Sequence, residues 1–288
     1  MPIKEYCRPT TLRETFDLLT RYAGSARILA GGTDLLIQQA LESSSEAVVV
    51  SLRDVEDLKQ IGETEGGEIF IGAMASHADV AQSPLVIRYF PALARASNWV
   101  GSPSIRNLAT IGGNICNASP SADTAPPLLA YGARPIIVSP SGQKVTAIED
   151  FFTGPSTSIL KTGEVLKGFM LTPKPGWIAG YEKLGIRKAM EIAIVNVCVA
   201  MAIDKGRYCT GIRIALGAVA PTPIRPQKAE AVLQDKKIIP ELIQKCAEVA
   251  MEETNPISDI RGSASYRKEM VRFMVGKIIS DFAGNLSF

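Results

Sequence analysis

The pattern of apolar and polar positions divides the chain into two regions, which differ in the length and spacing of their apolar runs. Up to about residue 172, short apolar runs of strand length alternate with amphipathic segments of helical spacing. The strand-like runs are 26–30, 47–52, 68–73, 134–139 and 164–171. These runs and the helical segments between them predict mixed α and β structure. The run 26–30 is predicted to be a short buried strand.

The second region begins after the segment 172–176, which contains two prolines and a glycine and favours neither helix nor strand. Two long β-rich runs follow, 192–201 and 212–219, with Gly206 near the turn between them. These predict an antiparallel sheet, covered by two helices at roughly 240–253 and 264–282. In the second helix one apolar stripe at helical spacing is interpreted as core: Tyr266, Met270, Phe273, Met274 and Ile278.

Several helix boundaries carry recognisable signals. Thr11 and Glu14 have the spacing of a capping box, and Gly24 is placed to end that helix in a left-handed turn. Ser76 is expected to cap a helix that Pro84 ends. His77 then lies in the first turn of that helix, where we interpret it as a surface residue.

Two runs combine adjacent glycines with polar residues. The first, Ala30 to Asp34, joins the strand 26–30 to a helix predicted over 35–41, with Thr33 or Asp34 as its N-cap. The second is longer and runs from Thr110 to Asp123. Glycine lets a backbone approach a ligand and lets N–H groups converge on an anion. Taken alone, Gly31-Gly32 could equally be a tight strand-to-helix turn, but together the runs predict one large phosphate-bearing ligand.

Composition narrows the class of protein. The 288 residues carry a net charge of +2, which gives no reason to expect nucleic acid or an anionic membrane as partner. No apolar run approaches the about 18 residues that span a bilayer, and the start of the chain does not resemble a signal peptide, so we expect the cytoplasm. The five cysteines form no C-x-x-C pair and histidine occurs once, so no metal site is expected in this chain. A chain so poor in catalytic groups is expected to use a bound cofactor.

The residues match a known family. The segments 28–35 (ILAGGTDL) and 105–114 (IRNLATIGGN) resemble the two FAD loops of the flavoprotein subunits of molybdenum hydroxylases. The segments 84–93 and 218–225 and the final helix resemble the same family, so the resemblance covers essentially the whole chain. The chain most resembles the separate FAD-binding (medium) subunit of xanthine dehydrogenases.

The resemblance implies an α+β protein of three parts. Two subdomains, 1–58 and 59–175, would form the two-subdomain FAD-binding fold of vanillyl-alcohol oxidase (PCMH) type. Residues 176–288 would form a C-terminal domain, a small antiparallel sheet with helices.

The resemblance also implies the cofactor site. Both loops would face the FAD pyrophosphate, Asp123 the ribityl hydroxyls, Val165 and Leu166 the isoalloxazine, and Lys183 the flavin carbonyl edge, where it could tune the redox chemistry. For Lys183 a surface lysine at a strand end is the equally weighted alternative. The cofactor-binding residues implied are Arg27, Ile28, Leu29, Ala30, Gly31, Gly32, Thr33, Asp34, Ala109, Thr110, Ile111, Gly112, Gly113, Asn114, Asp123, Val165, Leu166 and Lys183.

The function implied is electron transfer. The chain would accept electrons from a 2Fe–2S subunit, supplied by a molybdopterin subunit that oxidises a purine, and would pass them through FAD to NAD⁺ in a dimer of heterotrimers.

The alternatives are the FAD subunit of a hydroxylase acting on nicotinate, another N-heterocycle or carbon monoxide, and a nucleotide-binding scaffold without flavin. Carbon monoxide dehydrogenases usually have His-Ser where this chain has Thr33-Asp34. The absence of a cysteine cluster argues against the 4-hydroxybenzoyl-CoA reductase branch. Tyr181-Glu182 replaces the aromatic residue that usually precedes the lysine.

Overall fold

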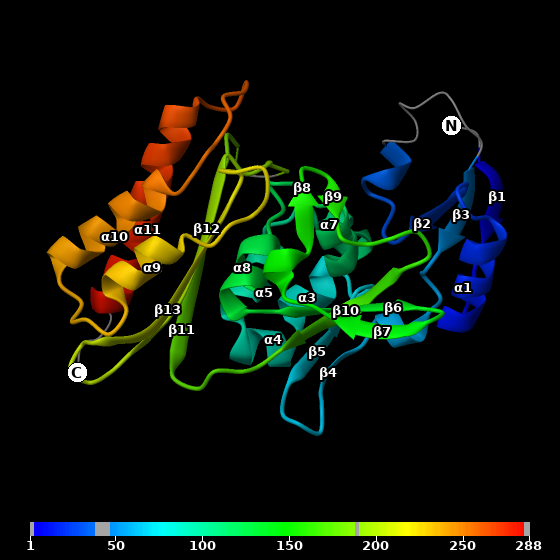
Figure 1. Ribbon diagram of the computed structural model, residues 1–288, viewed down its shortest axis with the longest axis horizontal. Coiled ribbons are helices and arrows are strands. Elements are labelled where there is room, and N and C mark those ends of the chain that lie inside the picture. Colours follow the sequence, from blue (N-terminus) through cyan, green and yellow to red (C-terminus); the bar gives the residue numbers. More distant parts are fainter. Residues whose placement is uncertain (1–2, 38–46, 188–189, 285–288) are drawn as a thin grey trace.

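The computed structural model describes residues 3–37, 47–187 and 190–284. These residues form the α+β fold that the sequence predicts, with a small N-terminal sheet, a larger central sheet and a C-terminal sheet arranged along the long axis of the molecule (Figure 1). None of the helices in these ranges is long and apolar enough to cross a membrane.

The N-terminal sheet is parallel and has the strand order β1-β3-β2. Its strands are β1 (Ile3–Cys7), β2 (Ala26–Leu29) and β3 (Ala47–Ser51). β3 is buried along its whole length because it is the central strand. β2 is an edge strand and is only half-buried, so the prediction of a buried strand at 26–30 was wrong in this respect.

Helix α1 (Leu12–Arg21) begins at the predicted cap. The Thr11 hydroxyl accepts from the Glu14 N–H, while the Glu14 carboxylate accepts from the Thr10 N–H instead of the Thr11 N–H. Gly24 adopts the predicted left-handed conformation, with φ of +87°. Residues 35–37 are helical, and the rest of the helix predicted over 35–41 lies outside the described residues.

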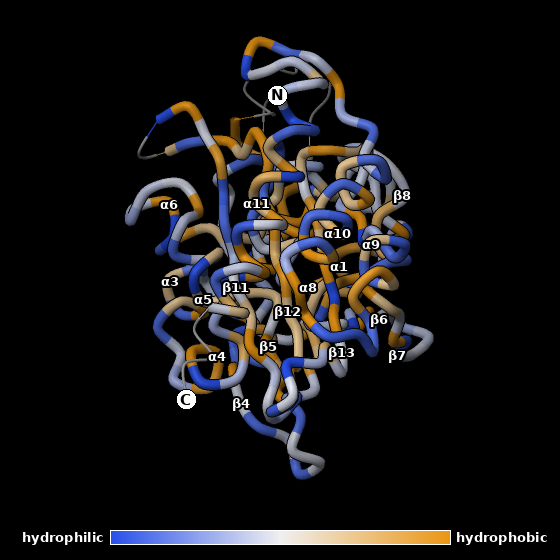
Figure 2. Tube along the Cα trace, turned by 90° about the vertical axis from the view of Figure 1, so that its left-hand side faces the viewer, coloured by the Kyte–Doolittle hydropathy of each residue, from blue (hydrophilic) through white to orange (hydrophobic). Residues whose placement is uncertain are grey.

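The central sheet has the order β4-β5-β10-β6-β7 and is antiparallel throughout. Its strands are β4 (Ile61–Glu63), β5 (Ile69–Gly72), β6 (Arg134–Ser139), β7 (Gly142–Val145) and β10 (Val165–Leu171). The hydrophilic hairpin between β4 and β5 projects from the body of the molecule (Figures 1 and 2). Between β7 and β10 lie the 3-10 turn η2 (Ile148–Asp150) and the short pair β8 (Phe152–Gly154) and β9 (Thr157–Ser158), and η1 (Glu56–Leu58) precedes β4.

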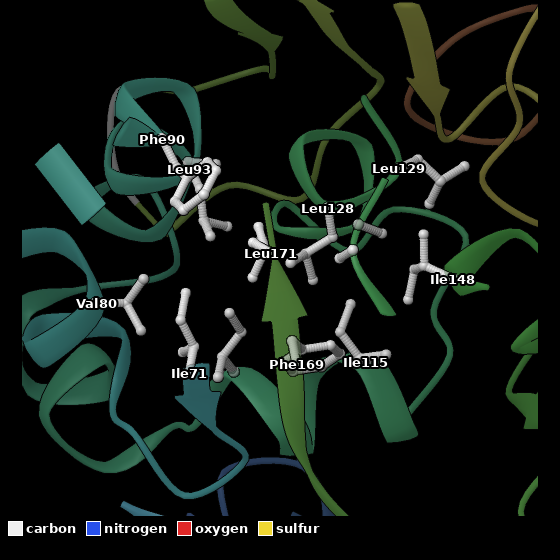
Figure 3. Packing of buried hydrophobic residues seen from close by; sticks show 14 of the residues in the cluster. Ile71, Val80, Phe90, Leu93, Ile115, Leu128, Leu129, Ile148, Phe169 and Leu171 are labelled. Atoms are coloured by element: carbon white, nitrogen blue, oxygen red, sulfur yellow. The ribbon is translucent and has the colours of Figure 1, made fainter. Parts of the chain in front are cut away.

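A layer of short helices packs against this sheet. It consists of α3 (His77–Gln82), α4 (Pro84–Tyr89), α5 (Pro91–Asn98), α6 (Pro103–Leu108), α7 (Ile111–Cys116) and α8 (Ala125–Tyr131). Figure 3 shows the core between them, where Val80 of α3 and Leu128 of α8 surround Ile71, Phe169 and Leu171 of the sheet. The segment 111–116 was expected to be a loop but forms helix α7. Its apolar positions Ile111 and Ile115 are fully buried in this core.

The C-terminal sheet is the predicted antiparallel one. Its strands are β11 (Trp177–Leu184), β12 (Val195–Ile203) and β13 (Cys209–Gly217), in that order. Val197 and Val199 face a cluster formed with α9 (Gln227–Leu233), α10 (Pro240–Glu252) and α11 (Ala264–Gly284), whereas Cys198 and Ala200 face the core of the central region. Because both faces are buried, β12 reads as a continuous apolar run instead of an alternating one.

The apolar stripe predicted for the last helix is only partly correct. Met274 and Ile278 are buried, but Tyr266 and Phe273 are exposed. The buried face of α11 instead contains Val271, Val275 and Ile279. Apolar residues lie on more than one face of this helix, so periodicity alone does not select the face that packs.

Candidate functional site

One cleft of about 550 Å³ brings the two glycine runs together. The loop after β2 forms one wall, α7 and the segment after it form the opposite wall, and the start of β10 and residues 190–192 close the sides. Most of the predicted site residues line this cleft. They are Ile28, Ala30, Gly31, Gly32, Thr33, Asp34, Ala109, Thr110, Gly112, Gly113, Asn114, Asp123, Val165 and Leu166.

Four of the predicted residues do not line the cleft. Arg27 and Leu29 flank the cleft-lining Ile28 and, because side chains alternate along a strand, point to the other side of β2. Ile111 is fully buried in the core cluster. The Lys183 side chain has no exposed surface and lies behind Asp123.

Two glycines allow close backbone packing around the cleft, Gly31 against the segment before the second run and Gly112 against the residue after β5. A Cβ atom on Gly31 would lie 2.1 Å from the carbonyl oxygen of Leu108, and one on Gly112 would lie 2.4 Å from the Cβ of Ala73. Both contacts are closer than real Cβ atoms approach, so these two positions accept no side chain without movement of the backbone. Gly32 has a different role, because its φ of +75° turns the chain from β2 toward the helix.

The backbone amides of the second run donate within the protein. Those of Ile111 and Gly112 donate to the carbonyl oxygens of Ala75 and Ala73, at 3.0 and 2.8 Å. The Gly113 amide donates to the Thr110 hydroxyl and the Asn114 amide to the Thr110 carbonyl, both at 3.0 Å. The expectation that this run offers backbone amides to an anion is therefore not met at Gly112, Gly113 and Asn114. The polar side chains that it presents to the cleft are those of Thr110, Asn114, Asn117, Ser119, Ser121 and Asp123.

The first run is different. Within the described ranges, the amides of Gly31, Gly32, Thr33 and Asp34 have no acceptor in the protein. All four residues line the cleft. Successive amides around a left-handed residue form a concavity of the kind that accepts an anion, so this loop is the candidate anion-binding part of the site.

Asp123 is the centre of a buried polar network. Its carboxylate accepts from the Lys183 ammonium at 2.8 Å and from the Tyr181 hydroxyl at 2.9 Å. Burial raises the pKa of Asp123, and the adjacent Lys183 ammonium counteracts part of that rise. The same ammonium donates to the carbonyl oxygen of Glu191 at 2.9 Å and, at 3.4 Å, to that of Trp99. Lys183 is thus fully engaged with the protein, which rejects the alternative of a surface lysine and places its charge behind the cleft wall.

His77 was also expected at the surface, and this was wrong. It is fully buried, and neither ring nitrogen has a hydrogen-bond partner among the described residues. Burial lowers its pKa to about 4, and the positive charge of Arg106 contributes in the same direction. His77 is therefore neutral at physiological pH. The helix cap itself is as predicted, since Ser76 and Asp79 form a reciprocal capping box.

The cleft has an apolar part that sequence reasoning identified only through Val165 and Leu166. Leu52, Met74 and Leu160 also line it, together with Met190 and Ile192 from the loop after β11. No local motif marks these residues, because they come from four separate segments and meet only in the fold. Cys116 lies in the wall as well, and burial raises the pKa of its thiol to about 12, so it is not a nucleophile.

Comparison with known proteins assigns the chain to a family. Residues 2–174 match the FAD binding domain in molybdopterin dehydrogenase, and residues 180–282 match the CO dehydrogenase flavoprotein C-terminal domain. The chain belongs to the family of FAD-binding subunits of molybdenum hydroxylases. It is a flavoprotein subunit of a multi-subunit molybdenum hydroxylase, and its cofactor is FAD.

The relatives span several members of that family. The putative xanthine dehydrogenase FAD-binding subunit of Escherichia coli (strain K12) is 34% identical over 278 residues, covering 96% of this chain and 94% of the relative. The carbon monoxide dehydrogenase medium chain of Hydrogenophaga pseudoflava is 32% identical over 282 residues, covering 97% and 96%.

Solved structures agree with the fold. A chain of the carbon monoxide dehydrogenase of Hydrogenophaga pseudoflava is 33% identical and superposes with a TM-score of 0.91. The superposition covers 96% of this chain and 96% of that chain. A chain of quinoline 2-oxidoreductase from Pseudomonas putida 86 gives a TM-score of 0.92 at 28% identity, with 100% of this chain and 99% of that chain covered.

Proposed function

We propose that FAD binds in the 550 Å³ cleft between the two glycine runs. The observation that carries the proposal is the convergence, on this one cleft, of four amides without an acceptor among the described residues and an apolar wall that includes Val165 and Leu166. The volume lies in the range of about 300–1,000 Å³ typical of cofactor sites. A polar concavity beside an apolar wall suits a cofactor with a diphosphate and a flat aromatic ring.

Each part of the cleft has a distinct role in this proposal. The amides of residues 31–34 hold the diphosphate, and hydrogen bonds to a charged group contribute about 1.5–3 kcal/mol each. Thr110 and Asn114 add side-chain donors from the facing run. Asp123 accepts from the ribityl hydroxyls, and the apolar wall excludes water from the isoalloxazine.

Lys183 acts on the flavin through Asp123. Its side chain has no exposed surface and its ammonium is paired with the carboxylate, so it fixes the position of Asp123 in the cleft wall and counteracts part of the rise in the pKa of Asp123 that burial causes. The role implied by the family resemblance, a direct approach of Lys183 to the flavin, is replaced in this proposal by an indirect one.

We further propose that the chain serves a complex of xanthine dehydrogenase type. The chain would hold FAD, which would supply electron transfer from a 2Fe–2S subunit to NAD⁺, while a molybdopterin subunit would oxidise a purine. Assembly as a dimer of heterotrimers in the cytoplasm, and the division of this chain at residues 58 and 175, belong to the same proposal. The 34% identity with the Escherichia coli relative supports it, and so does Thr33-Asp34 in place of the His-Ser usual in carbon monoxide dehydrogenases.

Co-purification tests the proposed complex. The chain is expressed with the molybdopterin and iron–sulfur subunits of its source organism, and the purified complex is mixed anaerobically with xanthine, nicotinate or carbon monoxide. We expect bleaching of the flavin absorbance with xanthine and NADH formation when NAD⁺ is added. Bleaching by nicotinate or carbon monoxide, and none by xanthine, would assign the chain to one of the alternative hydroxylases.

A further inference from the structure

The side chain of Asn114 is held by a residue that lies ten positions later. Asn114 lies in the first turn of α7, and its side-chain carbonyl oxygen accepts a hydrogen bond of 2.6 Å from the Thr124 hydroxyl. Thr124 is fully buried at the start of α8, whereas Asn114 is partly exposed and lines the cleft. The hydrogen bond therefore connects the cleft wall to the protein interior.

This hydrogen bond holds the oxygen end of the amide against Thr124. A carboxamide has an acceptor oxygen on one side and two N–H donors on the other, and a half-turn about its last torsion exchanges them. Because the Thr124 hydroxyl donates to the oxygen, the Nδ2 group is directed away from Thr124 and toward the accessible side. An exchanged amide would present its oxygen to the cleft, where it would repel a phosphate.

The orientation matters because the backbone around Asn114 is already engaged. The amides of residues 111–114 donate to Ala73, Ala75 and Thr110. Contacts from this part of α7 to an anion held by the first run must therefore come from side chains. Asn114 Nδ2 and the Thr110 hydroxyl are two such groups that line the cleft, and Ser119 and Ser121 lie farther along the same run.

We propose that Thr124 is a positioning residue for cofactor binding: its buried hydroxyl holds the Asn114 amide with both N–H donors facing the diphosphate of FAD. The inference rests on the proposed FAD cleft and extends it to a residue that touches no ligand. Thr124 does not line the cleft, so its effect on FAD must pass through Asn114.

A double-mutant cycle tests this dependence. FAD is titrated into the apoprotein of wild type, Thr124→Val, Asn114→Ala and the double variant, and dissociation constants are measured by flavin fluorescence. Valine keeps the shape of threonine and removes only the hydroxyl. We expect Thr124→Val, which loses a hydrogen bond between neutral groups, to weaken FAD binding by about 5–10-fold. We expect Asn114→Ala, which loses a hydrogen bond to a charged group, to weaken it by about 10–100-fold. In the Asn114→Ala background, Thr124→Val should change the dissociation constant by less than about 2-fold.

Two further variants separate positioning from packing. Thr124→Ser retains the hydroxyl and should bind FAD within about 2-fold of wild type. Thr15→Val removes another fully buried hydroxyl, which donates to the Thr11 carbonyl away from the cleft, and should leave FAD affinity unchanged. Unfolding transitions of all variants are recorded alongside.

The outcomes are distinguishable. Tight binding by wild type and equally tight binding by Thr124→Val would overturn the role of Thr124 and leave the FAD cleft standing. An equal loss in the wild-type and Asn114→Ala backgrounds would show that Thr124 acts by packing. Failure of the wild-type chain itself to bind FAD would overturn the proposed function and this inference with it.

Discussion

The ammonium of Lys183 lies 2.8 Å from the carboxylate of Asp123, and both side chains are buried. Lys183 belongs to β11 of the C-terminal sheet, and Asp123 precedes α8 of the central region. The ion pair therefore fastens the C-terminal sheet to the wall of the cleft. Tyr181 of the same strand donates to the second carboxylate oxygen, so one strand supplies both partners of Asp123.

Removal of the charge at position 183 should destabilise the fold. In Lys183→Met the Asp123 carboxylate stays buried without a counter-charge, and breaking a buried pair in this way costs about 3–5 kcal/mol. Denaturant unfolding measures the loss. The double variant Asp123→Asn/Lys183→Met removes both charges and should recover part of it.

Lys277→Met provides the matched control for this prediction. Lys277 pairs with Glu182 and Asp281 at the surface, where such pairs contribute about 0–1 kcal/mol. If Lys183→Met proved no less stable than Lys277→Met, the buried pair would not have the structural role described here.

Substitution of the two closely packed glycines should displace the backbone around the cleft. Alanine at Gly31 or Gly112 places a Cβ within 2.1–2.4 Å of protein atoms, and overpacking of this kind costs about 1–3 kcal/mol. We expect both variants to unfold earlier and to retain less flavin. Gly62→Ala is the control, because a Cβ there meets no atom within 4 Å. Wild-type flavin content in Gly31→Ala and Gly112→Ala would contradict this close packing around the cleft.

His77 should make the fold sensitive to mild acid. Its pKa is lowered from 6.5 to about 4, so the unfolded chain binds a proton in a pH range where the folded protein does not. This contribution to stability is fully present above pH of about 6.5 and is lost progressively as pH falls to about 4, by about 3 kcal/mol in total.

The variant His77→Phe isolates that contribution. Its free energy of unfolding should fall less steeply than that of wild type between pH 6.5 and 4. Parallel pH profiles for the two proteins would show that His77 is not buried in its neutral form.

The sequence predicted most of the elements because their signals are local. The capping residues Thr11 and Ser76 mark helix starts, and the runs at 47–52 and 134–139 are strands. It missed β11 and α9, and it misplaced His77 and two positions of the α11 stripe. These features depend on which neighbours cover a segment, and periodicity within the segment does not contain that information.

The candidate site shows the same contrast between features that have local signals and features that depend on tertiary contacts. The glycine runs identified the cleft, yet the sequence did not reveal that the amides of Ile111 and Gly112 donate to Ala75 and Ala73, whereas those of residues 31–34 have no acceptor in the part of the chain that the structure describes. Likewise, no spacing rule connects Lys183 with Asp123 or Thr124 with Asn114. Such pairs arise from tertiary folding, and the side chains of Met190 and Ile192 join the cleft for the same reason.

The central claim, that this cleft binds FAD, is tested most directly by the visible absorbance spectrum of the purified chain before and after addition of FAD. The account predicts the bands of oxidised flavin, and FAD in preference to FMN in the supernatant after denaturation. A chain that remains colourless after reconstitution with FAD, alone and in complex with its partner subunits, would contradict it.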